Sequence, residues 1–190
     1  MEIYLIRHTT PYVEKGICYG QSDLELAKNY KEDFKTVLSK VPKHNNYHVF
    51  SSPLQRCLLL AKQFKGKLVT DPRLKELNFG DWELKPWNSI NEDELSPWMN
   101  NFVTHKVPHG ESYVELAKRV NASIYEILNN NDNSNTPIVI ILHAGPLRAF
   151  LAQLLNVDLK NSFNIKINYG DVFHVRKTKE DLKLMTDINL

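Results

Sequence analysis

The stretch that decides the fold is PIVIILHAGP, residues 137–146. Residues 138–142 are all apolar, with no polar residue in alternation. Such a run is typical of a strand that is buried on both faces, as in a parallel sheet covered by helices. Gly145 and Pro146 then begin a predicted helix. The stretch therefore indicates a strand–helix unit of an α/β protein, with His143 at the point where the strand ends.

The same alternation of strands and helices extends outward from this unit. Strands are predicted at residues 3–6, 47–51, 67–70, 138–142, 171–176 and 182–187, the last two as a hairpin. A first helix is predicted at residues 22–41, with Ser22 or Asp23 as its cap. A second is predicted to follow Ser52 as cap, with Pro53 at the first helical position and Gln55 closing a capping box. A third begins with a capping box of Ser112 and Glu115, and a fourth begins at Gly145. This order predicts a three-layer α/β/α sandwich on a mostly parallel sheet of about six strands. No repeat or interdomain linker interrupts it, so residues 1–190 are expected to form a single domain.

The composition is typical of a globular protein of the cytoplasm. The 190-residue chain is 42% hydrophobic and 24% charged, its formal net charge is only +2, and it has no basic stripe, so no nucleic-acid partner is expected. No apolar run approaches the ~18 residues of a membrane span, and the N-terminus lacks the pattern of a signal peptide. Cys18 and Cys57 fit neither a CxxC pair nor a zinc spacing, which indicates free thiols in a reducing compartment. Both a monomer and a homodimer are compatible with the sequence.

Reactive side chains follow four of the predicted strands. Arg7 and His8 follow the first, and Arg56 lies in the first turn of the helix after the second. Glu76 lies in the loop after the third, and His143 ends the strand at 138–142. Each has an ordinary structural explanation, such as a surface turn, a solvated arginine or a histidine bonded to backbone. Because ligands bind beyond the carboxyl ends of such strands, the five residues together favour one site at that edge.

This set of residues favours phosphoryl chemistry. Two guanidiniums can bind phosphate oxygens, and a histidine oriented through one ring nitrogen can attack phosphorus with the other. A nearby carboxyl group can protonate the departing oxygen. The sequence contains no GxGxxG, P-loop, HExxH or GxSxG motif. A zinc site that uses His8 and His143 remains an alternative.

Five segments resemble, in order, the motifs of the histidine phosphatase superfamily, the phosphoglycerate mutase-like proteins. They are LIRHT (5–9), SSPLQRC (51–57), ELNFGDWE (76–83), PHGES (108–112) and LHAGPLR (142–148). The resemblance implies that His8 is a nucleophile phosphorylated on Nε2 and that Glu76 donates the proton to the leaving alcohol. It implies that Arg7, Arg56 and His143 bind the phosphate of a small phosphomonoester, with no metal and no cofactor.

A sixth segment narrows the expected substrate. GICYGQSDLELA, residues 16–27, is similar to the CYGxxDxPL segment of α-ribazole phosphatases, although Glu25 stands where proline is usual. This similarity implies removal of the phosphate from α-ribazole 5′-phosphate or adenosylcobalamin 5′-phosphate in cobalamin assembly. It also places Gln21 in a segment that reaches the substrate in the family. Elsewhere Leu84 and His109 replace family glycines, His109 adding an imidazole near the mouth of the site, and Leu142 replaces a serine or threonine.

The sequence is also compatible with functions other than that of an α-ribazole phosphatase. The alternatives are a broad-specificity phosphatase of sugar phosphates or nucleotides, a phosphoglycerate mutase, and a non-catalytic phosphate-binding module. The presence of both His8 and Glu76 disfavours the last, because such modules usually lose the nucleophile or the donor. Residues 71–110 are expected to be irregular, and their Trp- and Pro-rich part, 82–98, is of a kind that often carries a substrate lid. Residues 129–137 are expected to form a polar loop.

Overall fold

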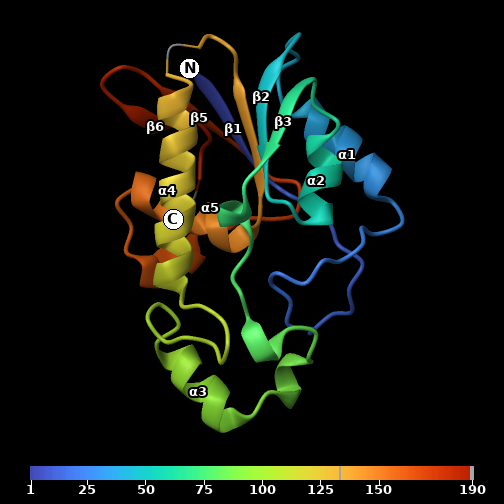
Figure 1. The fold of residues 1–190 in the computed structure, drawn as a ribbon, viewed down its shortest axis with the longest axis vertical. Coiled ribbons are helices and arrows are strands. Elements are labelled where there is room, and N and C mark those ends of the chain that lie inside the picture. Colours follow the sequence, from blue (N-terminus) through green and yellow to red (C-terminus); the bar gives the residue numbers. More distant parts are fainter. Residues whose placement is uncertain (133, 189–190) are drawn as a thin grey trace.

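A six-stranded sheet forms the centre of the protein, in the strand order β3-β2-β4-β1-β5-β6 (Figure 1). We describe residues 1–132 and 134–188 of a computed structural model. The strands are β1 (Glu2–Arg7), β2 (Tyr47–Ser51), β3 (Gly66–Thr70), β4 (Ile138–Leu142), β5 (Val172–Lys177) and β6 (Leu182–Leu184). The pairs among β1 to β4 are parallel, whereas β5 and β6 are antiparallel additions at one edge. The predicted mostly parallel sheet is confirmed.

Helices cover both faces of this sheet. The main helices are α1 (Tyr30–Ser39), α2 (Gln55–Ala61), α4 (Tyr113–Asn130) and α5 (Ala144–Leu154). Alternate residues of the apolar strand β4 explain the arrangement: Val139 and Ile141 join a core with α1 and α2, while Ile138, Ile140 and Leu142 join the core under α4 and α5. Figure 1 shows the two pairs of helices on opposite sides of the strands. The three-layer sandwich is thus confirmed, and it explains why β4 has no polar residue.

Two predicted helix starts are wrong. The helix expected at residues 22–41 begins only at Tyr30, because the amide and hydroxyl of Ser22 bond the carboxylate of Glu83 instead of starting a helix. The helix expected to start at Ser52 begins at Gln55, with Leu54 as a cap that makes no side-chain bond. The hydroxyl of Ser52 accepts only a long bond from the amide of Leu54, at 3.4 Å, and lies closer to Nε2 of His143, at 2.8 Å. In both cases a contact with a distant residue outweighs the local capping signal.

The other element boundaries differ by a few residues. The Ser112–Glu115 capping box is present, and α4 continues to Asn130, so the polar loop expected at 129–137 starts later and includes residue 133, which lies outside the described residues. α5 starts at Ala144 with His143 as its cap, one residue before the expected start. The final strand ends at Leu184 rather than at residue 187.

The segment between β3 and α4 extends beyond the carboxyl ends of the parallel strands (Figure 1). It contains short 3₁₀ helices at Pro72–Leu74, Gly80–Trp82 and Trp87–Ser89, and the helix α3 (Glu92–Asn100). Another 3₁₀ helix, Leu159–Asn164, follows α5. Trp82 and Trp98 pack edge to face with ring centroids 5.6 Å apart, and Trp87 stacks on Trp98. This aromatic cluster gives an otherwise irregular segment a core of its own next to the sheet.

Candidate active site

His8 and His143 lie side by side because their strands are neighbours. Arg7, the last residue of β1, pairs with Leu142, the last residue of β4. The amide of His8 donates to the carbonyl of Leu142 at 3.0 Å, and the two imidazole rings meet edge to face with centroids 5.0 Å apart. The parallel pairing of β1 and β4 therefore brings together the two histidines predicted at strand ends.

The imidazole of His8 is held in the form that a nucleophile needs. Its Nδ1 donates to the carbonyl of Thr9 at 2.7 Å, so the ring proton is on Nδ1 and the lone pair is on Nε2. Burial, together with the positive charges of Arg56 and Arg7, holds the pKa of His8 well below its ordinary value. The ring is therefore neutral near pH 7.

Two arginines are oriented by backbone carbonyls, and each leaves its buried Nε without a partner in the described part of the chain. The terminal nitrogens of the buried Arg56 donate to the carbonyls of Gly20 and Ser22 at 2.5 and 2.8 Å. Arg7 donates to the carbonyl of Ile167 at 2.9 Å and lies over the ring of Tyr169, 3.8 Å from its centroid. The buried Nε atoms of both arginines have no hydrogen-bond partner among the described residues. An anion beside His8 would satisfy donors of this kind.

His143 is fully buried behind His8. Its Nε2 lies 2.8 Å from the hydroxyl of Ser52 and 3.5 Å from the sulfur of Cys57. Burial, together with the charge of Arg56, holds the pKa of His143 well below its ordinary value. Ser52 directly follows the neighbouring strand β2, and its hydroxyl gives His143 a polar partner that the apolar side chain of Leu142 does not offer.

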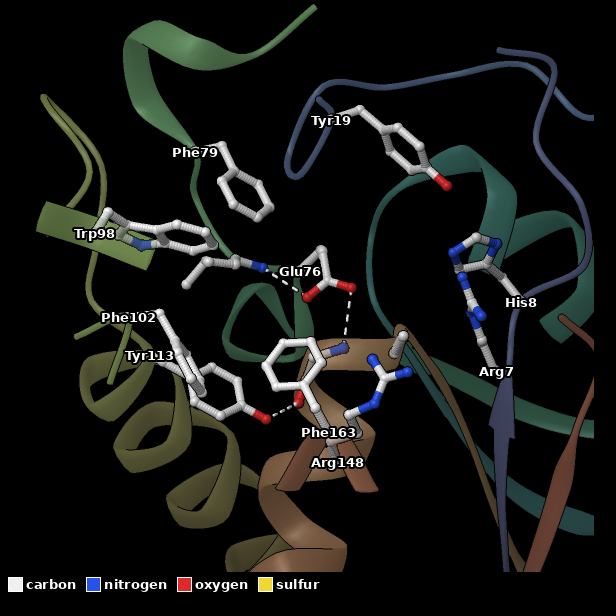
Figure 2. Close-up of a pocket in the computed structure, with 13 residues that line it drawn as sticks. Arg7, His8, Tyr19, Glu76, Phe79, Trp98, Phe102, Tyr113, Arg148 and Phe163 are labelled. Atoms are coloured by element: carbon white, nitrogen blue, oxygen red, sulfur yellow. Dashed lines mark hydrogen bonds between the residues drawn. The ribbon is translucent and has the colours of Figure 1, made fainter. Parts of the chain in front are cut away.

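The carboxylate of Glu76 is held between two backbone amides. One oxygen accepts from the amide of Leu77 at 2.8 Å, and the other from the amide of Gly145, in the first turn of α5, at 3.1 Å. A Cβ atom on Gly145 would lie 2.2 Å from Oε1 of Glu76, so any larger residue at this position would displace the carboxylate. Figure 2 shows Glu76 and His8 on opposite sides of the pocket.

These groups meet at a cavity of about 160 Å³. Its polar wall includes Arg7, His8, Glu76 and Arg148. Its aromatic wall is formed by Tyr19, Phe79, Trp98, Phe102, Tyr113 and Phe163 (Figure 2). Arg56 and His143 are not part of this wall, because both lie fully buried behind it. The site thus has a charged end at the sheet and an aromatic end at the segment after β3.

Gln21 lies outside the cavity wall. Its amide nitrogen donates to the backbone carbonyl of Glu76 at 3.1 Å, and its own backbone amide donates to Glu83 at 2.7 Å. In this structure Gln21 therefore contacts the backbone of the predicted proton donor. A direct contact with substrate stays a prediction.

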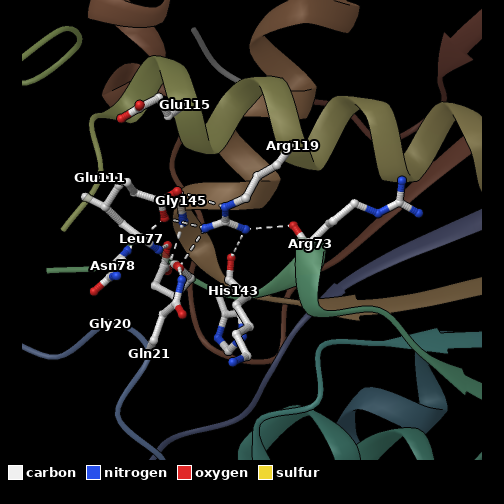
Figure 3. Close-up of polar contacts among 12 residues, drawn as sticks. Gly20, Gln21, Arg73, Leu77, Asn78, Glu111, Glu115, Arg119, His143 and Gly145 are labelled. Atoms are coloured by element: carbon white, nitrogen blue, oxygen red, sulfur yellow. Dashed lines mark hydrogen bonds and ion pairs between the residues drawn. The ribbon is translucent and has the colours of Figure 1, made fainter. Parts of the chain in front are cut away.

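A polar network that the sequence motifs did not indicate supports the loop of Glu76 (Figure 3). Arg119 donates to the carbonyls of Arg73, Lys75 and Glu76 at 2.7, 2.7 and 2.8 Å. It also donates twice to the carboxylate of Glu111, at 2.5 and 2.9 Å. Glu111 belongs to the PHGES motif and could have been suspected, whereas Arg119 lies in an ordinary amphipathic helix.

Leu84 and His109 adopt a left-handed backbone conformation of the kind that usually favours glycine. Their φ angles are 64° and 54°, in the left-handed region. His109 is exposed, and its Nδ1 lies 2.8 Å from the carboxylate of Asp81. It is not among the residues that line the cavity, so the imidazole expected near the mouth is bound to Asp81 instead.

The segment expected to form a lid contributes to the cavity through Trp98, whereas Trp82 is buried behind it. Movement of residues 82–98 during turnover stays a prediction. Within residues 1–132 and 134–188, no group of three or more His, Cys, Asp or Glu is placed to hold a metal ion. In the same part of the chain, no helix has the length and apolar character to cross a membrane.

Residues 3–187 match the family described as "Histidine phosphatase superfamily (branch 1)". The chain belongs to this superfamily. It is 28% identical to "Putative phosphoserine phosphatase 2" from Hydrogenobacter thermophilus, over 96% of this chain and 93% of that protein. It is 30% identical to "Probable phosphoglycerate mutase GpmB" from Yersinia pestis, over 83% of this chain and 76% of that protein.

Solved structures share the fold across nearly the whole chain. The alpha-ribazole phosphatase from Shigella flexneri superposes with a TM-score of 0.81 at 21% identity, covering 97% of this chain and 94% of that one. A phosphoserine phosphatase mutant from Entamoeba histolytica, in complex with phosphoserine, gives 0.80 at 21% identity, covering 99% and 96%. The chain therefore shares its fold with phosphatases that are named for different substrates.

Proposed function

We propose that this protein is a phosphomonoesterase that works through a phosphohistidine at His8. The proposal rests on the protonation state and orientation of the imidazole ring of His8. Nδ1 is bound to the carbonyl of Thr9, which leaves Nε2 as a nucleophile, and the nearby Arg7 and Arg56 each keep an unpartnered Nε. These donors suit the oxygens of a phosphate group, whose charge spreads over its equatorial oxygens during transfer.

The reaction has two steps. In the first, Nε2 of His8 forms a bond to phosphorus while the bond from phosphorus to the alcohol oxygen breaks, and Glu76 gives its proton to that oxygen. In the second, water attacks the phosphohistidine, Glu76 takes a proton from the water, and phosphate leaves as the bond from His8 to phosphorus breaks. The position of Glu76 across the cavity from His8 suits an in-line displacement (Figure 2).

The test is direct trapping of the phosphorylated enzyme. Incubation with a ³²P-labelled phosphomonoester should give a label that is stable to base and labile to acid, and mass spectrometry should place it on His8. His8→Ala should lose the label and nearly all turnover, whereas His105→Ala, which changes an exposed histidine outside the cavity wall, should keep both. Full turnover by His8→Ala would refute the proposal. Added chelator should have no effect, as a metal-independent reaction requires.

Two kinds of substrate remain candidates. The sequence favours α-ribazole 5′-phosphate or adenosylcobalamin 5′-phosphate, and the aromatic wall supports this choice because Tyr19, within GICYGQSDLELA, could stack with a base. The named activities of the relatives, and the cavity of about 160 Å³, support smaller phosphomonoesters. A comparison of kcat/KM for α-ribazole 5′-phosphate with a panel of small phosphomonoesters separates the two. Similar values across the panel would favour broad specificity.

A further inference from the structure

Arg148 lines the cavity with a guanidinium that is only partly satisfied. Its Nε donates to the carbonyl of Ile165 at 3.2 Å, and its guanidinium carbon lies 5.0 Å from the ring centroid of Phe163. Within residues 1–132 and 134–188, its terminal nitrogens have no hydrogen bond or ion pair to protein. Figure 2 shows this guanidinium directed into the pocket beside Glu76. A half-buried cation held in this way is ready to bind an anion.

Glu76 does not neutralise Arg148. Both oxygens of Glu76 accept from backbone amides, those of Leu77 and Gly145, and no ion pair joins it to Arg148 in the described part of the chain. Burial lowers the pKa of Arg148 more than the charge of the nearby Glu76 raises it, so holding the cation at this wall costs free energy. A group that arrives with the substrate can supply the missing partner.

The charges of the site indicate what this group is. Arg7, Arg56 and Arg148 provide three positive charges, and a phosphomonoester near pH 7 brings about two negative ones. When Glu76 carries the proton that it donates, one positive charge remains uncompensated. A single carboxylate balances it, whereas a second phosphate group would exceed it.

The size of the cavity limits the rest of the molecule. Its volume of about 160 Å³ is well below the ~300–1,000 Å³ of pockets that enclose drug-sized ligands. The aromatic side chains Phe102 and Tyr113 line the side of the cavity away from His8 (Figure 2). A phosphate and a short carbon chain fit such a space.

We infer that Arg148 binds a carboxylate on the alcohol part of the substrate, so that the preferred substrates are phosphomonoesters of small hydroxy acids. The inference rests on the proposed phosphatase function and chooses between its two kinds of substrate. Arg148 is then the specificity-determining residue of the site, since it distinguishes acidic alcohols from neutral ones, nucleosides included.

The test compares two esters that differ in one group: 3-phosphoglycerate, with a carboxylate, and glycerol 3-phosphate, with a hydroxymethyl group in its place. The wild-type kcat/KM should favour the acid by roughly 10- to 100-fold, the range of a hydrogen-bonded charge pair. Arg148→Met should reduce the preference to about 2-fold or less, and Arg148→Lys should retain part of it. Lys166→Met removes an exposed positive charge next to Ile165 but outside the cavity, and should keep the wild-type preference.

A binding measurement separates this inference from the proposed reaction. Calorimetry on the His8→Ala protein should show tighter binding of 3-phosphoglycerate than of glycerol 3-phosphate, and the difference should vanish when Arg148→Met is added. Equal binding of the two esters, or a preference that survives Arg148→Met, would overturn the role of Arg148 even if His8 is phosphorylated. Loss of the phosphohistidine with the binding preference intact would overturn the reaction and support the carboxylate subsite.

Discussion

At the scale of single residues, Gly145 is the position where one added carbon should impair catalysis. In Gly145→Ala, the new Cβ would meet Oε1 of Glu76 at 2.2 Å, so the carboxylate must leave the place where it faces the leaving oxygen. Loss of a positioned proton donor costs on the order of 10²-fold or more in rate for an alkyl phosphate. An aryl phosphate, whose leaving group needs little protonation, should lose much less.

The measurement for Gly145→Ala is the ratio of kcat for an alkyl and an aryl phosphomonoester. Glu76→Gln should change this ratio in the same direction, because it removes the proton that Gly145→Ala misplaces. An equal loss for both esters in Gly145→Ala would show that the substitution disturbs the phosphate end instead. An unchanged ratio in Glu76→Gln would contradict the role of Glu76 as donor.

Strand-end reasoning predicted part of the site but not all of it. His8 and His143 were found because their positions follow from β1 and β4 alone. Arg148 and the aromatic wall were not found, because they come from segments far apart in the chain whose meeting depends on tertiary packing. Arg148 ends the LHAGPLR motif, but its place on a helix does not show whether its side chain faces a cavity.

At the scale of elements, α4 should control catalysis through Arg119. This side chain ties α4 to the carbonyls of residues 73–76 and to Glu111, and so fixes the loop that carries Glu76 (Figure 3). Arg119→Met should lower kcat for an alkyl phosphate more than for an aryl phosphate, by about 10-fold or more. KM should change less, because Arg119 is not among the residues that line the cavity.

A matched control distinguishes positioning from a general loss of stability. Lys118→Met changes a neighbouring, exposed cation of the same helix and should leave the ratio of alkyl to aryl turnover unchanged. Arg119→Lys should rescue little, because an ammonium cannot reproduce the planar set of donors. If Arg119→Met lowered only the melting temperature and kept the ratio, Arg119 would be structural and not a positioning residue.

Local signals predicted the elements that are held by local contacts. The capping box of Ser112 and Glu115 is complete within four residues, and α4 begins where it predicts. The helix expected from residue 22 fails because Glu83, 61 residues away, binds the amide and hydroxyl of Ser22. Sequence patterns describe competition among neighbours, and they do not include a partner supplied by another part of the fold.

At the scale of the whole molecule, the two buried histidines should make stability depend on pH. Folding holds the pKa of His8 and of His143 well below the ordinary value of 6.5, so the unfolded chain binds more protons as the pH falls below that value. The free energy of unfolding should therefore fall with decreasing pH, by at most about 1.4 kcal/mol per pH unit for each histidine. Above pH 7 this contribution should be constant.

Denaturant unfolding at several values between pH 7 and pH 5 measures this slope. His8→Gln should reduce the slope of unfolding free energy against pH by the contribution of one histidine. His105→Gln, at an exposed position, should leave this slope unchanged. A wild-type slope that His8→Gln does not alter would mean that His8 is already free to protonate in the folded protein. The neutral nucleophile of the proposed reaction would then lose its physical basis near pH 6.

The surface positions of Leu84 and His109 can accept different residues during evolution. Both are exposed side chains on left-handed turns that glycine would also form, so their identity can change without rebuilding the backbone. A return to glycine would relieve strain of about 1–2 kcal/mol and cost about 0.4–1 kcal/mol through the greater freedom of the unfolded chain. Selection can therefore vary the charge and shape at these turns almost independently of the chemistry at His8.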